Sequence, residues 1–185
     1  AILKDKDNNL VTGAIVRFSA DSGEIRTISV GGGTATTQAG VTDDSGRAQA
    51  LLTTSANRHN RVITVTAQVS TTKGEIKTAT IPIKIVGTNI KVTGENTLIM
   101  GGKSELTITL ADNGNNGIAN DTLKVESSLG NTISNPAPVT DANGQTKVTV
   151  TATVAGQDII TVSKDGATSG TLAINISDQD FTLVP

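Results

Sequence analysis

Hydrophobic and polar residues alternate along several short stretches of the chain. A period of two is typical of a strand that buries one face, and no stretch has a convincing helical period. The alternating apolar positions are Val16, Phe18 and Ala20; Ala50 and Leu52; Ile63 and Val65; Ile81, Ile83 and Ile85; Leu106, Ile108 and Leu110; Leu123 and Val125; Val148 and Val150; Ile160 and Val162; and Leu172, Ile174 and Ile176. The pattern predicts an all-β fold.

Short polar stretches rich in Asp, Asn and Gly separate these strands. They read "DKDNN" at 5–9, "TDDSG" at 42–46, "NGNNG" at 113–117, "TDANG" at 140–144 and "KDG" at 164–166. An Asp side chain can accept hydrogen bonds from its own backbone in a turn, and Gly tolerates positive φ. We therefore expect Asp43–Gly46 and Asp141–Gly144 to be tight turns that lead into core strands, without a catalytic or metal-binding role.

The chain repeats itself. "VTDDSGRAQALLTT" at 41–54 matches "VTDANGQTKVTVTA" at 139–152, and residues 3–23 match 110–130 in the same way. Further on, "ITV" at 63–65 aligns with "ITV" at 160–162, and "TIPIKI" at 80–85 aligns with "TLAINI" at 171–176. A repeat of this length indicates tandem domains, and short strands over about a hundred residues favour a two-sheet sandwich.

The repeat predicts domain limits of 1–86 and 88–177, with 178–185 as the start of a following module. The first repeat then lacks its first strand and half of the next. In the tail, Phe181 and Leu183 align with Ile90 and Val92. We expect the first repeat to expose a sheet edge to which other chains, or such a tail, can pair at high concentration.

These residues carry a family resemblance. The stretches "LKDKDNNLVTGAIVRFSADSG", "VTDDSGRAQALLTT" and "RVITVTA" resemble the bacterial Ig-like domain (group 1) of the invasin and intimin adhesins. The second repeat is similar, with Asn120 and Thr146 in place of the family's Gly and Ala, and neither repeat has its usual Pro. The positions that fit the pattern are Asp5, Asn9, Val11, Gly13, Val16, Phe18, Ser19, Thr42, Asp43, Gly46, Ala48, Val65 and Ala67, and in the second repeat Asp112, Asn116, Ile118, Leu123, Val125, Thr140, Asp141 and Gly144.

The resemblance implies tandem Ig-like Greek-key β-sandwiches, the first N-terminally truncated. It also implies a place in the extracellular stalk of a surface protein in the outer membrane of a Gram-negative bacterium. Parts outside this chain would provide the membrane anchor and the tip that meets a cell-surface receptor. The neighbouring partners would be further Ig-like repeats. These motifs belong to the scaffold, so they specify a fold and not a ligand.

The composition of the chain limits the classes of function that it can have. The net charge is −2, aromatic residues make up 1% of the chain, and there is no cysteine. Nucleic-acid binding needs basic clusters or aromatic stacking surfaces, and neither is present. The chain has one histidine, His59, and no cysteine. Zinc sites and catalytic triads of a nucleophile and a histidine usually need these residues, so both kinds of site are disfavoured. We expect no enzyme activity and no cofactor.

Two weaker candidates remain for binding. Asp5, Asp7 and Asn9 stand at alternate positions and suggest calcium, although an EF-hand loop would need Gly at 10 and Glu at 16. The segment 24–40 is longer than its counterpart 131–138, and loops at sandwich ends often carry recognition. Its candidate residues are Glu24, Arg26, Thr34, Thr36 and Gln38.

Three functions follow from the sequence. The leading prediction is a spacer in the stalk of an adhesin. The alternative is a module that itself recognises a receptor or glycan, with 24–40 as the candidate binding segment, although the lack of aromatic anchors argues against it. The third is an accessory domain of a secreted enzyme.

The stretch "GGKS" at 101–104 resembles the end of a phosphate-binding loop. It does not fit that motif, because position 97 is Thr where a Gly is needed and the residues that follow alternate like a strand.

Overall fold

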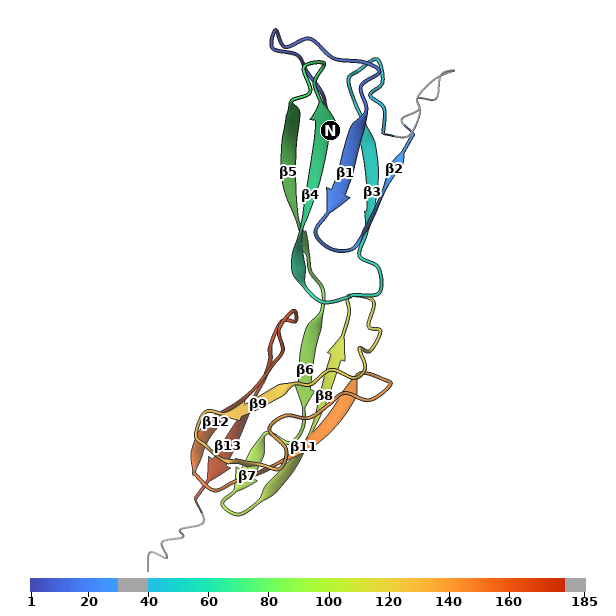
Figure 1. The fold of residues 1–185 in the computed structure, drawn as a ribbon. Coiled ribbons are helices and arrows are strands. Elements are labelled where there is room, and N and C mark those ends of the chain that lie inside the picture. Colours follow the sequence, from blue (N-terminus) through green and yellow to red (C-terminus); the bar gives the residue numbers. More distant parts are fainter. Residues whose placement is uncertain (30–39, 179–185) are drawn as a thin grey trace, which may run out of the picture. The chain divides into compact units, whose positions relative to one another are not determined.

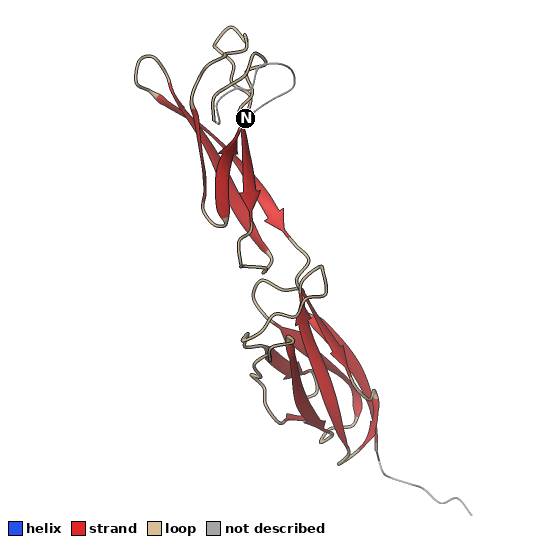
Figure 2. Ribbon diagram, turned by 90° about the vertical axis from the view of Figure 1, so that its right-hand side faces the viewer, coloured by secondary structure: helices blue, strands red, loops and turns tan. Residues whose placement is uncertain are grey.

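The computed structural model describes residues 1–29 and 40–178. They form two compact units: unit 1 contains Ala1–Asn57 and Arg61–Ile85, and unit 2 contains Arg58–Asn60 and the chain from Val86 onward. Figure 1 labels the strands of both units except β10, and Figure 2 shows strands and loops throughout the described residues. Within those residues, no helix is long and apolar enough to cross a membrane.

Over residues 1–29 and 40–178 all the regular secondary structure is β-strand, which confirms the all-β prediction. The strands of unit 1 are β1 (Val16–Ala20), β2 (Glu24–Ile28), β3 (Gln49–Thr53), β4 (Arg61–Ser70) and β5 (Ile76–Ile85). Those of unit 2 are β6 (Asn89–Thr93), β7 (Thr97–Ile99), β8 (Lys103–Ala111), β9 (Lys124–Ser127), β10 (Thr132–Ile133), β11 (Gln145–Thr151), β12 (Gly156–Ser163) and β13 (Gly170–Ser177).

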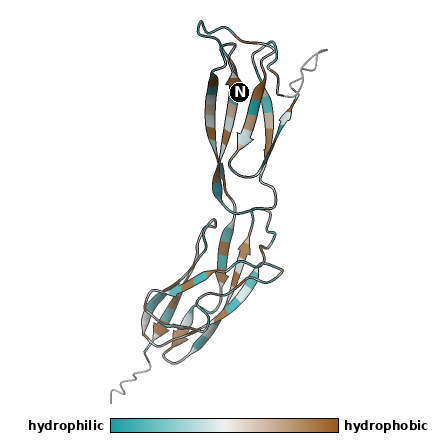
Figure 3. Cartoon of the chain, in the orientation of Figure 1, coloured by the Kyte–Doolittle hydropathy of each residue, from teal (hydrophilic) through white to brown (hydrophobic). Residues whose placement is uncertain are grey.

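Unit 2 is a sandwich of two four-stranded sheets. One sheet has the order β10-β11-β8-β6 and the other β7-β13-β12-β9. Hydrophobic and hydrophilic residues alternate along these strands (Figure 3). The apolar side chains of the two sheets form one buried cluster. The buried cluster contains Ile90, Val92, Leu106, Ile108, Leu110, Leu123, Val125, Val148, Val150, Ala152, Ile160, Val162, Ile174 and Ile176.

Unit 1 is smaller. Its sheets are β1-β4-β5 and β2-β3, and the described residues add only isolated bridges to them. Among its described residues, the buried apolar ones are Val16, Ala48, Ile63 and Val65. The large apolar side chains Ile76 and Ile81 on β5 are 63% and 59% exposed. Unit 1 therefore has much less core than unit 2.

The two units show that one alignment from the sequence is wrong. Phe18 on β1 pairs with Ala67, whereas its counterpart Val125 on β9 pairs with Val162. The pairing of β4 with β5 and that of β12 with β13 lead to the same result. Ile63 lies opposite Ile83, and Asp158 lies opposite Ile174, the counterpart of Ile83. Val65 thus corresponds to Ile160. The two "ITV" motifs are out of register by two residues, which keeps the alternation of faces and so cannot be detected from it.

Candidate functional site

Segment Arg58–Asn60 of unit 2 is held by a dense set of polar contacts around Thr88. The Asn60 side chain donates to the Thr88 carbonyl at 2.8 Å and accepts from the Thr88 N–H at 2.9 Å. The Thr88 hydroxyl donates to the Arg58 carbonyl at 2.5 Å, and the Asn60 N–H donates to the Gly166 carbonyl at 2.6 Å. Thr88 is buried, so these bonds satisfy groups that water does not reach.

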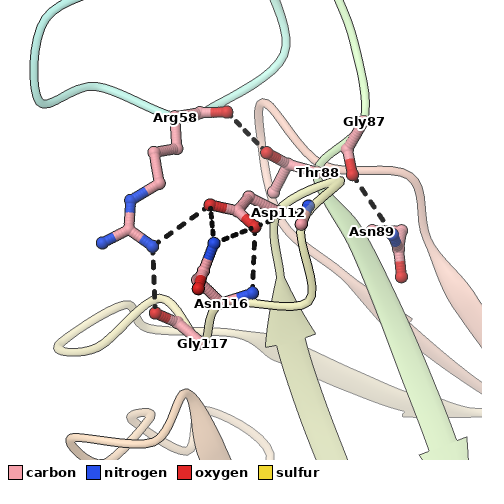
Figure 4. Close-up of polar contacts among 8 residues, drawn as sticks. Arg58, Gly87, Thr88, Asn89, Asp112, Asn116 and Gly117 are labelled. Carbon is pink, nitrogen blue, oxygen red and sulfur yellow. Dashed lines mark hydrogen bonds and ion pairs between the residues drawn. The ribbon is translucent and has the colours of Figure 1, made fainter.

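The Arg58 side chain reaches across to the turn after β8. Its guanidinium donates to the Asp112 carboxylate and to the Gly117 carbonyl, each at 3.3 Å (Figure 4). Figure 4 also shows the Asn116 side chain bonded to the same carboxylate. The Arg58 side chain is 46% exposed, so the ion pair contributes less than the bonds of Asn60.

His59 lies against a second acidic group. Its Nε2 is 3.1 Å from the Asp121 carboxylate, whose other oxygen is 3.4 Å from the Lys164 ammonium. Gly166 allows the approach, because a Cβ there would lie 2.8 Å from the His59 Cβ. These contacts hold the segment against Asp121 and, through it, Lys164.

Asp112 also organises its own turn, and three other aspartates do the same. In each turn, one carboxylate oxygen accepts the N–H groups of the second and fourth residues that follow. The bonds run from Asp7 and Asn9 to Asp5, from Ser45 and Arg47 to Asp43, from Gly114 and Asn116 to Asp112, and from Asn143 and Gln145 to Asp141, all at 2.8 or 2.9 Å. The tight turns predicted at Asp43–Gly46 and Asp141–Gly144 are thus confirmed.

The third residue after each aspartate has positive φ: 68° at Asn8, 64° at Gly46, 61° at Asn115 and 72° at Gly144. A type I turn followed by such a residue is a common three-residue hairpin loop. The N–H donors favour the ionised carboxylate. The pKa of Asp43 is held below its usual range, first by the bond from the Arg47 N–H, and that of Asp112 first by the bond from the Asn116 N–H.

The calcium candidates Asp5, Asp7 and Asn9 lie in the first of these turns. Asp5 accepts both N–H groups and, at 3.1 Å, the Asn9 side chain, so its oxygens serve the turn. The pKa of Asp5 is lowered mainly by Asn9. Asp7 points to Lys6, 2.8 Å away. No group of three or more His, Cys, Asp or Glu within 1–29 and 40–178 is arranged to hold a metal. Calcium binding at these residues stays a prediction.

The candidate recognition segment 24–40 is partly strand. Glu24 and Arg26 belong to β2, which pairs with β3 over five residues, and both side chains are exposed. The counterpart strand β10 has two residues. Thr34, Thr36 and Gln38 lie outside the described residues. The structure therefore gives the first part of the segment a place in a sheet, and the proposed ligand contacts stay a prediction.

A buried carboxylate on β12 was missed by the sequence reasoning. Asp158 is fully buried and accepts from the hydroxyls of Ser127 and Ser128, the N–H of Leu129 and the Asn131 side chain, at 2.7 to 3.1 Å. Burial raises its pKa, but the bonds from Asn131, Ser127, Leu129 and Ser128 outweigh burial and hold the pKa below its ordinary value.

The network around Asp158 is closed by its own members. The carbonyl oxygen of the Asn131 side chain accepts the N–H groups of Thr153 at 2.7 Å and Val154 at 2.8 Å. The Ser127 hydroxyl accepts the Asn131 N–H at 2.8 Å. Every side-chain oxygen of Asp158 and Asn131 accepts hydrogen bonds from within unit 2. The network therefore holds two loops in place and leaves none of these oxygens for a ligand.

The contacts of Arg58–Asn60 were also missed. Thr88, Asp112 and Gly117 lie 28 to 59 residues away along the chain. Nothing in the local pattern around Arg58–Asn60 marks such partners. In a single sequence the only signal is the concentration of side chains with several hydrogen-bonding groups, and the same composition is typical of a solvated loop.

Comparison with known proteins places the second half of the chain in a family. Residues 90–177 match the family model described as bacterial Ig-like domain (group 1). No curated protein is a significant match to the chain.

Several solved structures resemble the chain at low sequence identity. The adhesin InvE of Yersinia pseudotuberculosis is 18% identical with a TM-score of 0.49, covering 95% of this chain and 52% of that structure, so the chain spans about half its length. The D00-D0 domain of intimin is 15% identical with a TM-score of 0.40, covering 88% and 85%. Invasin, described as a bacterial integrin-binding protein, is 19% identical with a TM-score of 0.42, covering 96% and 35%.

The matched residues cover the sandwich of unit 2 from β6 to β13, including the parallel pair β7 and β13. Unit 2 is thus similar to the bacterial Ig-like domain (group 1) family over residues 90–177.

Proposed function

We propose that the chain is a pair of spacer modules in the extracellular stalk of a bacterial surface adhesin of invasin and intimin type. In this proposal unit 1 is a second Ig-like module that lacks its first strand. The partners are further Ig-like repeats of the same protein, and an outer-membrane anchor and a receptor-binding tip lie in other parts of it. No catalytic step is part of the proposal.

One observation carries the proposal: five carboxylates of the described residues are bonded within the fold. The carboxylates of Asp5, Asp43, Asp112 and Asp141 close turns, and Asp158 anchors loops. A recognition or catalytic site instead needs polar groups that converge on an accessible pocket. The family match of residues 90–177 supports the same class of protein.

The test is a binding experiment with the labelled chain on host cells, bacterial cells and a glycan panel, with and without calcium. A spacer gives no saturable signal above an unrelated Ig-like control. The matched variant shortens 24–40 to the length of 131–138. Saturable binding that this variant abolishes would overturn the spacer proposal in favour of recognition through 24–40, and binding that requires calcium would direct attention to Asp5, Asp7 and Asn9.

A further inference from the structure

His59 holds its segment on unit 2 through a side chain whose charge changes near neutral pH. It is the only histidine of the chain. Its neighbours Arg58 and Asn60 attach the same segment through a guanidinium and an amide. Those two groups keep one protonation state between pH 5 and pH 8, whereas an imidazole ordinarily gains a proton near pH 6.5. Of the three side chains, only His59 therefore makes a contact that depends on pH in this range.

The acidic partner of His59 is a largely buried carboxylate. The Asp121 side chain is 16% exposed and that of His59 is 26% exposed, with the imidazole Nε2 3.1 Å from Oδ2 of the carboxylate. Oδ2 is buried, and within the described residues it accepts no hydrogen bond of regular geometry. A buried carboxylate oxygen without a donor is destabilising, so a positive charge brought to it is stabilising.

Lys164 provides a second cation at the same carboxylate. Its ammonium lies 3.4 Å from Oδ1 of Asp121. It belongs to the turn of Gly166, which packs against His59, and Asp165 on that turn is exposed. Asp121, Lys164 and Asp165 are thus the titratable groups on the two loops that meet the imidazole. Repulsion from the ammonium lessens the stabilisation that a proton on His59 adds.

We propose that His59 makes the hold of the segment Arg58–Asn60 on unit 2 sensitive to pH. Protonation turns the contact with Asp121 into an ion pair of imidazolium and carboxylate, in a partly buried site where charges interact more strongly than in water. The hold is therefore tighter on the acid side of the imidazole titration and weakens as the pH rises through it. The inference does not depend on the spacer function, because it concerns the contacts of this segment alone.

Amide exchange measured by NMR at pH 5.5 and pH 8, with rates corrected for the intrinsic effect of pH, tests the proposal. The reporters are the N–H of Asn60, which donates to the Gly166 carbonyl, and the N–H of Thr88, which donates to the Asn60 side chain. We expect their protection to be at least about threefold higher at pH 5.5. Ile160 and Val162, in the core strand β12, should keep equal protection, because they report the opening of the whole unit.

Two variants of the contact should change the pH response in opposite directions. His59→Gln keeps a hydrogen-bonding side chain without a titratable proton, so the rise in protection should vanish while protection at pH 8 stays near that of the wild type. This variant retains the amino terminus, the other kind of group that ordinarily titrates in this range. Lys164→Gln removes the competing ammonium, so the rise should become at least about twice as large. A histidine with a purely structural role would not respond to Lys164 in this way.

The remaining outcomes also decide the matter. Equal protection of Asn60 and Thr88 at the two pH values, or a rise that His59→Gln retains, overturns the proposal. Weaker protection at pH 5.5 also overturns it, because repulsion from Lys164 would then outweigh attraction to Asp121. Circular dichroism checks that the variants fold. If His59→Gln does not fold, Asp121→Asn takes its place and should remove the rise as well.

Discussion

At the scale of the residue, Asp158 shows how a buried charge is made acceptable. Its carboxylate accepts four hydrogen bonds in the interior of unit 2, and together they outweigh the cost of burial on its ionised form. The corresponding position in unit 1 is Ile63, also fully buried. The same fold thus accepts either an aliphatic side chain or a fully bonded carboxylate at this point of the strand.

We expect Asp158→Asn to destabilise unit 2 by about 2–3 kcal/mol, because an amide leaves some of the four donors without an acceptor. The folded pKa of Asp158 lies below the unfolded one. The stabilisation is therefore complete above the unfolded pKa, near 4, and is lost as the pH falls through the folded pKa. Urea unfolding followed by amide exchange in β12, from pH 7 to pH 2, measures both effects.

The control is Asp165→Asn, at an exposed aspartate of the same unit. It should leave the unfolding free energy within about 0.5 kcal/mol. A variant of Asp158 that retains the full acid dependence of the wild type would show that other carboxylates control the acid response of unit 2.

The glycine of the turn at Asp141 supports a second prediction at this scale. Gly144 has φ of +72°, and a Cβ there would lie 2.4 Å from the Leu110 carbonyl oxygen and 2.5 Å from the Ile118 nitrogen. Gly130 has φ of +78° with nothing within 4 Å. We expect Gly130→Ala to cost about 1 kcal/mol from backbone strain alone, and Gly144→Ala at least about 3 kcal/mol because backbone must also move.

Equilibrium unfolding of the two alanine variants in the same buffer compares these costs directly. Equal losses of stability would mean that the backbone of Leu110 and Ile118 moves away from a Cβ at position 144 without cost. The positive φ alone would then explain the glycine.

At the scale of the element, Arg58–Asn60 is held mainly by Asn60. We expect Asn60→Ala to speed amide exchange at Thr88 roughly 5- to 10-fold, since the Thr88 N–H loses its acceptor. Arg58→Ala should have a smaller effect, because it removes an exposed ion pair and one bond to Gly117. Exchange followed by NMR at low and at high salt gives both numbers.

Salt should reduce the difference between Arg58→Ala and the wild type and leave the effect of Asn60→Ala unchanged, because screening acts on the charge pair alone. If Arg58→Ala speeds exchange more than Asn60→Ala does, the segment is held mainly by the contact of Arg58 with Asp112 and not by the bonds of Asn60 with Thr88.

The same scale shows what the sequence can predict. Alternation located the strands, and the Asp and Gly spacing located the turns, since both are local signals. The register of β4 against β1 was missed, because a shift of two residues keeps every side chain on its face. The contacts of Arg58–Asn60 and the network of Asp158 join residues far apart along the chain, and no local pattern encodes such partners.

At the scale of the whole molecule, the two units differ in how much apolar surface they bury. Unit 2 buries a cluster of fourteen apolar residues, whereas the buried apolar residues of unit 1 are Val16, Ala48, Ile63 and Val65. Burial of a Val, Leu or Ile side chain contributes about 1.5–3 kcal/mol before the cost of ordering the chain. Unit 1 should therefore be the less stable unit.

We accordingly expect two unfolding transitions, with unit 1 melting first. Amide exchange in β4 and β5 should follow the first transition seen by calorimetry, and exchange in β11, β12 and β13 the second. A single transition in which both groups of strands exchange together would mean that the two units unfold cooperatively despite their unequal cores.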